Sequence, residues 1–219
     1  MTALLAPEAV RWLTTPVRPG TRVVVAGVAG GVGTTTVVAL LWTALDAARP
    51  GGVGAVDHSG GSLPARLAAG THGGYDALGG TEPDLVLHDL GPHALTTAAG
   101  VLDVPDQVVV VVCGAHDAGL LAARASLGGL AERTGKGDAE QWAVVVPVAV
   151  AGRSAPRARL RDRAVELGVR AAVMPVARDR RLAAGGSVPP WGSASEVHRT
   201  AGALAAEVVR CARWVGVTQ

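Results

Sequence analysis

A glycine-rich segment that follows a run of β-branched residues is the part of this chain best suited to bind an anion. Residues 23–36 read VVVAGVAGGVGTTT, and an apolar helical pattern continues over residues 37–48. A strand, a glycine turn and a helix in that order expose backbone N–H groups at the positive end of the helix. Glycine also lets a phosphate approach the backbone closely. The segment predicts a phosphate-binding turn made of Gly30, Gly31, Val32, Gly33, Thr34, Thr35 and Thr36.

This turn lacks the lysine that normally accompanies a phosphate-binding loop. Lys136 is the only lysine among the 20 basic residues of the chain, and it falls between a helical pattern and the next strand. That position predicts the edge of the sheet opposite the turn. Arg153, Arg178 and Arg181 follow later strands instead, so they lie on the same edge as the turn and are candidates to reach a phosphate.

Length and composition indicate one globular domain with a substantial core. The chain has 219 residues, 49% of them hydrophobic, and a net charge of only +2, which gives no general attraction to nucleic acid. No apolar run reaches the roughly 18 residues needed to span a bilayer, and the start has no signal-peptide pattern. Cys113 and Cys211 show no metal-binding spacing and read as reduced thiols. We therefore expect a cytoplasmic protein, with a short helix and linker at 1–20 and one domain at 21–219.

Strand-like and helix-like patterns alternate along the chain. The strand-like runs are 22–26, 53–56, 84–88, 107–113, 142–146 and 171–174; the helical patterns are 34–48, 118–133, 154–167 and 195–215. Such alternation predicts an α/β fold with a mostly parallel central sheet covered by helices on both faces. Pro147 is expected to end its strand and Ser154 to cap the helix that follows. Ligands of such sheets bind at the carboxyl ends of the strands.

Four motifs in order resemble the ParA/MinD ATPases over about residues 20–210. The run AGGVGTTT resembles the family's deviant Walker loop, which is roughly GKGGVGKTT. Ala55-Val-Asp57 resembles the second-strand D-x-D region, and Asp89-Leu-Gly-Pro resembles the third-strand aspartate with its switch segment. Val173-Met-Pro-Val-Ala-Arg-Asp resembles a late stretch of the family. The resemblance implies a P-loop NTPase-like fold and a site for ATP or ADP with Mg²⁺.

The resemblance also assigns roles to individual residues. Thr35 matches the hydroxyl that holds Mg²⁺, Asp89 matches the carboxylate in the outer shell of the metal, and Asp57 matches the first acid of D-x-D. Several positions depart from the pattern: the two lysine positions carry Ala29 and Thr34, the second acid falls on Ser59, and the base-reading asparagine falls on Pro147.

These departures remove the groups on which hydrolysis depends. Phosphoryl transfer is catalysed mainly by positioning and by neutralising charge on the phosphates, and loss of one such stabilising group costs about 2.7–4 kcal/mol of barrier. We therefore expect a pseudo-ATPase with weak or no nucleotide binding, which acts as a scaffold or positioning factor for a protein partner. Relatives with atypical loops localise a secretion, pilus or septum apparatus. Because Ala29 replaces the lysine that helps relatives dimerise, any homodimer should not depend on ATP.

Two other functions remain open. The first is a slow ATPase that uses an arginine or a partner's cation. The second is an NAD(P)-binding oxidoreductase, since Gly27, Gly31 and Gly33 fit a dinucleotide spacing and Asp57 would bind a ribose hydroxyl. This second alternative lacks its catalyst, because the only tyrosine, Tyr75, has no lysine four residues later.

Two surface features are weaker candidates for binding. Residues 153–181 carry nine arginines against three acids, a local excess of +6, which indicates either a solvated face or a site for an acidic protein, phospholipid or DNA backbone. Nucleic acid and membrane are not favoured, since no aromatic residues interleave with the arginines. His58, His88 and His93 lack a recognised metal-binding spacing.

Overall fold

The computed structural model describes residues 5–60, 63–67, 83–93, 107–134, 139–150, 155–191 and 195–215. Four residues named above, Tyr75, Lys136, Arg153 and Ser154, lie outside these ranges, so the structure does not bear on their predicted roles.

The described strands form one six-stranded parallel sheet in the order β2-β3-β1-β4-β5-β6. The strands are β1 (Thr21–Gly27), β2 (Val53–Asp57), β3 (Leu85–Asp89), β4 (Gln107–Gly114), β5 (Ala143–Val148) and β6 (Ala172–Val173). All eight residues of β4 are buried, as expected for a central strand that is covered on both faces. The predicted α/β class and parallel sheet are confirmed.

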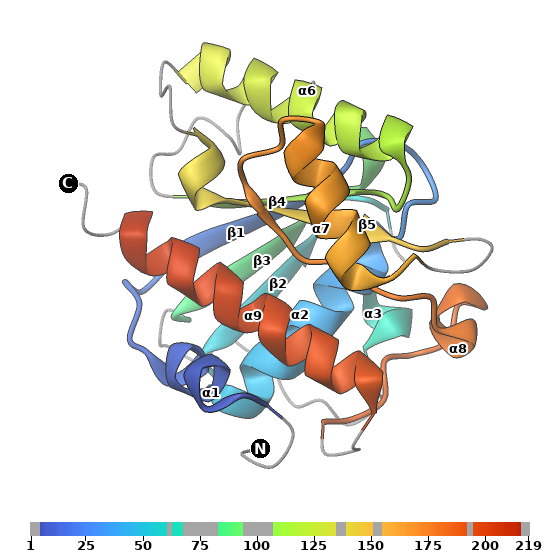
Figure 1. The fold of residues 1–219 in the computed structure, drawn as a ribbon. Helices are drawn as coiled ribbons and strands as arrows, with labels where there is room; N and C mark the ends of the chain where they lie inside the picture. Colours follow the sequence, from blue (N-terminus) through green and yellow to red (C-terminus); the bar gives the residue numbers. More distant parts are fainter. Residues whose placement is uncertain are drawn as a thin grey trace.

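Helices cover both faces of the sheet (Figure 1). The described helices are α1 (Pro7–Thr14), α2 (Thr34–Ala48), α3 (Leu63–Arg66), α6 (Asp117–Thr134), α7 (Arg157–Glu166), α8 (Arg180–Ala183) and α9 (Glu196–Val215), with short 3₁₀ turns η1 (Gly91–His93) and η2 (Ala139–Trp142). One core cluster joins α2 and α9 to one face, and a second joins α6 and α7 to the other. None of the helices in the described ranges is long and apolar enough to cross a bilayer.

The N-terminal helix α1 is part of this packing. Leu5 and Leu13 are buried in the same core cluster as α2 and α9, and α1 lies against α9 in Figure 1. The fit is tight, because a Cβ added at Gly202 of α9 would lie 2.6 Å from a methyl carbon of Leu5. Residues 5–14 therefore pack with the α/β core and do not form a separate arm.

The prediction that Pro147 ends its strand is wrong. Pro147 lies inside β5 opposite Cys113 of β4, and the strand continues to Val148. Because Pro147 has no N–H, it affects the pairing of β5 with the neighbouring strand β6. Met174 N–H still donates to the Val145 carbonyl, but Pro147 has no N–H with which to continue the ladder. β6 accordingly ends at Val173, and a single bridge joins Val148 to Val176 beyond it.

The helix predicted over 154–167 is shorter than expected. It begins at Arg157, with Pro156 at the N-cap. Proline at this position is extended (φ −53°, ψ 140°) and starts the helix through its fixed φ without a side-chain cap. The four-residue helices α3 and α8 were not predicted, since neither is long enough to show a helical repeat of apolar residues.

Candidate functional site

The glycine turn between β1 and α2 has the backbone form of a phosphate-binding loop. Gly31 (φ +74°) and Gly33 (φ +91°) are both left-handed, and Gly33 is the N-cap of α2. The side chain of Val32 is buried in the core and fixes the turn from below. Because the first N–H groups of α2 have no partner within the helix, they are available to an anion.

A cavity of about 300 Å³ lies at this turn, on the carboxyl edge of the sheet. Residues from the turn, from the end of β2, from α3 and from the segment after β3 line it: Ala29, Gly31, Gly33, Thr34, Thr35, Thr36, Ser59, Arg66, Gly91 and Pro92. Five of the seven predicted phosphate-binding residues thus line one cavity. The other two, Gly30 and Val32, belong to the same turn but are not among its lining residues.

Two aspartates meet beside the cavity because of strand register. Asp57 ends β2, Asp89 ends β3, and the two residues are paired in the ladder. Alternation places both on the face that carries α2. Ser59 connects them: its hydroxyl lies 2.7 Å from Asp57 Oδ1 and 3.5 Å from Asp89 Oδ2, and its N–H donates to Asp57 Oδ1 at 2.8 Å.

Asp89 is fully buried and sits under the turn. Burial raises the pKa of its carboxyl, and the nearby Asp57 charge raises it further, whereas hydrogen bonds from Thr35, Gly91 and Ser59 act in the opposite direction. The Gly91 N–H donates to Asp89 Oδ1 at 3.1 Å. A buried carboxylate next to a hydroxyl is a suitable environment for a divalent cation, which would stabilise the ionised form. The predicted pair Thr35 and Asp89 is therefore brought together.

A second cavity of about 210 Å³ adjoins the first and is more apolar. Besides the turn residues Gly31, Gly33 and Thr36 and Arg66 of α3, it is lined by residues at or beyond the ends of β5 and β6: Val148, Ala149, Val150, Val176, Ala177, Arg178, Asp179, Leu182 and Ala183. Arg178 is thus at the site, as predicted, whereas Arg181 is not among the residues lining either cavity. Pro147 offers no side-chain donor or acceptor to a base at this position.

Sequence reasoning missed Arg66, which lines both cavities. It ends α3, whose Leu63 is buried in the core. The signal was present, because Arg66 follows the second strand on its carboxyl side, just as Arg153, Arg178 and Arg181 follow later strands. Among the described residues that line the first cavity, Arg66 is the only charged one.

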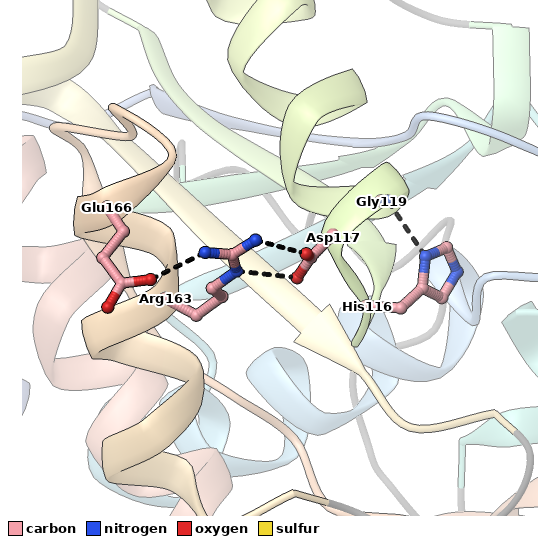
Figure 2. A network of polar contacts seen from close by, with 5 residues as sticks. All are labelled: His116, Asp117, Gly119, Arg163 and Glu166. Atoms are coloured by element: carbon pink, nitrogen blue, oxygen red, sulfur yellow. Dashed lines mark hydrogen bonds and ion pairs between the residues drawn. The ribbon is translucent and has the colours of Figure 1, made fainter.

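Several arginines of the helix α7 form ion pairs and hydrogen bonds with other parts of the chain. Figure 2 shows Arg163 between Glu166 and Asp117 of α6; it donates to the Asp117 carboxylate at 3.0 and 2.6 Å and to Glu166 at 2.7 Å. Arg157 pairs with Glu196 of α9, and Arg161 donates to the Val173 carbonyl. These contacts hold α7 to its neighbours and reduce the charge left for a partner.

Two of the three histidines that lack a metal-binding spacing in the sequence, His58 and His88, lie next to each other. His58 Nε2 lies 3.0 Å from His88 Nδ1, and the two rings are within 13° of parallel. Burial, together with the nearby His58 and Arg22, lowers the pKa of His88 to about 4. The side chain of His93 is outside the described set. No cluster of three or more metal-ligating side chains occurs within the described ranges.

No protein-family model matches this chain, and a search of the curated proteins finds no match either.

Proposed function

We propose that this protein is a nucleotide-binding pseudo-ATPase, which holds ATP or ADP with Mg²⁺ and acts through a protein partner as a scaffold or positioning factor. The observation that carries the proposal is the pair of adjoining cavities at the glycine turn. One is polar and lies over the α2 N-terminus, and the other is more apolar than the first. This division suits a phosphate chain joined to a nucleoside.

The magnesium ion has suitable ligands in this arrangement. Mg²⁺ keeps several waters and takes few protein ligands besides the phosphates. Thr35 would supply a hydroxyl, and Asp89 would act from the outer shell, supported by its contacts with Thr35 and Ser59. When bound, the ion would neutralise charge on the phosphates; the chain's own contribution is to orient them through the turn.

The same geometry supports loss of hydrolysis. Thr34 and Ala29, which stand at the lysine positions of the resemblance, line the first cavity and bring no charge to it. Ser59 stands where the water-positioning acid is expected, and its hydroxyl is hydrogen-bonded to Asp57. A neutral hydroxyl held in this way is a poor base for an attacking water.

A thermal shift measurement tests binding, and phosphate release tests turnover. Nucleotide at 100 times its Kd should stabilise the folded chain by about 2.7 kcal/mol, which corresponds to about 5–10 °C for a domain of this size. ATP and ADP with Mg²⁺ should both produce the shift, and NAD should not. Thr35→Ala should weaken the Mg²⁺-dependent part, whereas Thr43→Ala, on the same helix but away from the cavity, should not.

Each other outcome has a definite meaning. Absence of any shift with ATP or ADP contradicts nucleotide binding. Steady phosphate release that Thr35→Ala abolishes contradicts the pseudo-ATPase and favours the slow, partner-stimulated enzyme. A shift with NAD alone favours the dinucleotide-binding alternative.

A further inference from the structure

Arg66 lies where the two cavities meet. The lining residues common to both are Gly31, Gly33, Thr36 and Arg66, and only Arg66 is charged. The first cavity extends from this junction toward Ser59, Gly91 and Pro92. The second extends toward residues at or beyond the ends of β5 and β6, which are mostly apolar and include the charged residues Arg178 and Asp179, neither of which lines the first cavity. A nucleotide that fills both would therefore place the phosphate nearest its nucleoside beside Arg66.

The Arg66 side chain is held in place before any ligand arrives. Its Nη1 donates to the Leu182 carbonyl at 2.6 Å and to the Gly186 carbonyl at 3.3 Å, and its own carbonyl accepts from Val188 N–H at 2.8 Å. These contacts tie α3 to α8 and the segment after it. Figure 1 shows α3 and α8 on the same side of the molecule. The rotamer entropy that a long side chain loses on binding is largely lost already.

The charge of Arg66 is not neutralised by these partners. Both acceptors are backbone carbonyls, and no carboxylate among the described residues pairs with the guanidinium. A guanidinium has five N–H donors, so donors remain after Nη1 is used. Its planar fork fits phosphate oxygens, and hydrogen bonds to a charged group are about twice as strong as neutral ones.

We infer that Arg66 is the cation that binds the nucleotide, and that it contacts the phosphate at the junction and not the terminal one. This inference rests on the proposed function and adds a specific consequence. Since the terminal phosphate lies away from Arg66, it makes no contact with this guanidinium. Loss of the Arg66 charge should then weaken AMP, ADP and ATP by the same factor, whereas adenosine, which has no phosphate, should be unaffected.

Calorimetric titration of the full chain tests this inference. The ligands are adenosine, AMP, ADP and a non-hydrolysable ATP analogue, each with Mg²⁺. We expect Arg66→Ala to weaken AMP, ADP and the ATP analogue by the same factor, about 10- to 100-fold. Arg66→Gln also removes the charge but keeps a longer, polar side chain, so it should lose similar affinity and disturb the packing of α3 less than Arg66→Ala does.

Arg124→Ala is the matched control. Arg124 also donates through Nη1 to a backbone carbonyl, that of Leu167, but it is not among the residues lining either cavity. It should leave every affinity unchanged. Circular dichroism tests whether each variant is folded. If Arg66→Ala does not fold, the affinities measured for Arg66→Gln decide the result.

The outcomes separate the inference from the function on which it rests. If the wild-type chain binds none of the phosphorylated ligands, both are overturned. If it binds them and Arg66→Gln binds equally well, the role of Arg66 is overturned and nucleotide binding stands. If Arg66→Gln weakens only the triphosphate, the cation contacts the terminal phosphate and its assigned position is wrong.

Discussion

The hydroxyl oxygen of Thr34 lies directly over Gly27, and a Cβ built on that glycine would come within 2.4 Å of it. The Thr34 side chain is only 7% exposed, although it also lines the first cavity. The first residue of α2 is thus packed against the last residue of β1 across the base of the turn. Because these two residues are so close, the shape of the turn depends on Gly27, which lies outside the GGVG run.

Replacing Gly27 should therefore disturb the turn. We expect Gly27→Ala to lower the free energy of unfolding by about 1–3 kcal/mol, because the added methyl group overpacks the contact with Thr34 and Val32. Urea denaturation measures the change. Gly30→Ala is the control, since a Cβ there meets nothing within 4 Å, and it should alter stability by less than about 0.5 kcal/mol. Equal effects of the two substitutions would contradict the packing argument.

Thr34→Lys should restore a cation to the turn. Because Thr34 lines the polar cavity, a lysine side chain can extend into it and meet the phosphates. ATP affinity, measured by calorimetry, should rise about tenfold or more. Thr14→Lys adds the same charge at an exposed position on α1 and should leave the affinity unchanged. No gain from Thr34→Lys would mean that the cavity does not receive phosphate.

The buried carboxylate of Asp89 should lower the free energy of unfolding at neutral pH. Burial raises the pKa of its carboxyl in the folded chain, so the stability that it contributes is present at low pH and is lost as the pH rises through the folded-state pKa. At pH 7, Asp89→Asn should therefore raise the free energy of unfolding by about 0.5–2 kcal/mol while weakening Mg²⁺-dependent nucleotide binding. Urea denaturation and calorimetry measure the two effects.

Asp84→Asn serves as the contrasting control. Asp84 pairs with Arg49 at 3.3 Å, and the Arg49 side chain is 8% exposed, so removing this carboxylate should lower stability. If Asp89→Asn destabilises the unliganded chain as Asp84→Asn does, the cost assigned to the buried charge is wrong.

His88 should give stability the opposite dependence on pH. Burial, His58 and Arg22 lower its pKa to about 4, so the folded chain disfavours the charged ring. The stability contribution of the neutral ring is present above the unfolded-state value of about 6.5 and is lost as the pH falls from there toward 4. We expect a decrease on the order of 1–2 kcal/mol across that range, less than the full linkage value because the ring is only partly buried.

His88→Gln should remove this part of the pH dependence, as measured by urea denaturation at pH 7, 5.5 and 4.5. An unchanged slope in His88→Gln would show that other groups dominate acid destabilisation.

The sequence predicted the long, regular elements well. Valine-rich runs such as Gln107–Gly114 allow few alternatives to a buried strand, and α2 shows its apolar face plainly. The sequence also places an aspartate at the end of two short strands, Asp57 and Asp89, although their pairing in the sheet is a finding of the structure. The strands and helices are local features, so the sequence carries them directly.

The features that were missed depend on contacts between distant segments. Arg66 joins the site because α3 packs against α8, which lies 116 residues further along the chain at Leu182. The effect of Pro147 appears in β6, which is a different strand. Likewise, the arginines of α7 looked like a free basic face until their partners on α6 and α9 were placed. Periodicity and propensity contain no information on such pairings.

Pro147 has one more consequence, which concerns self-association. β6 has only two residues, and its pairing with β5 resumes at Val176, whose N–H donates to the Pro147 carbonyl. A border interrupted in this way offers a second molecule a shorter continuous row of N–H and C=O groups than an unbroken strand would, which disfavours edge-to-edge pairing there.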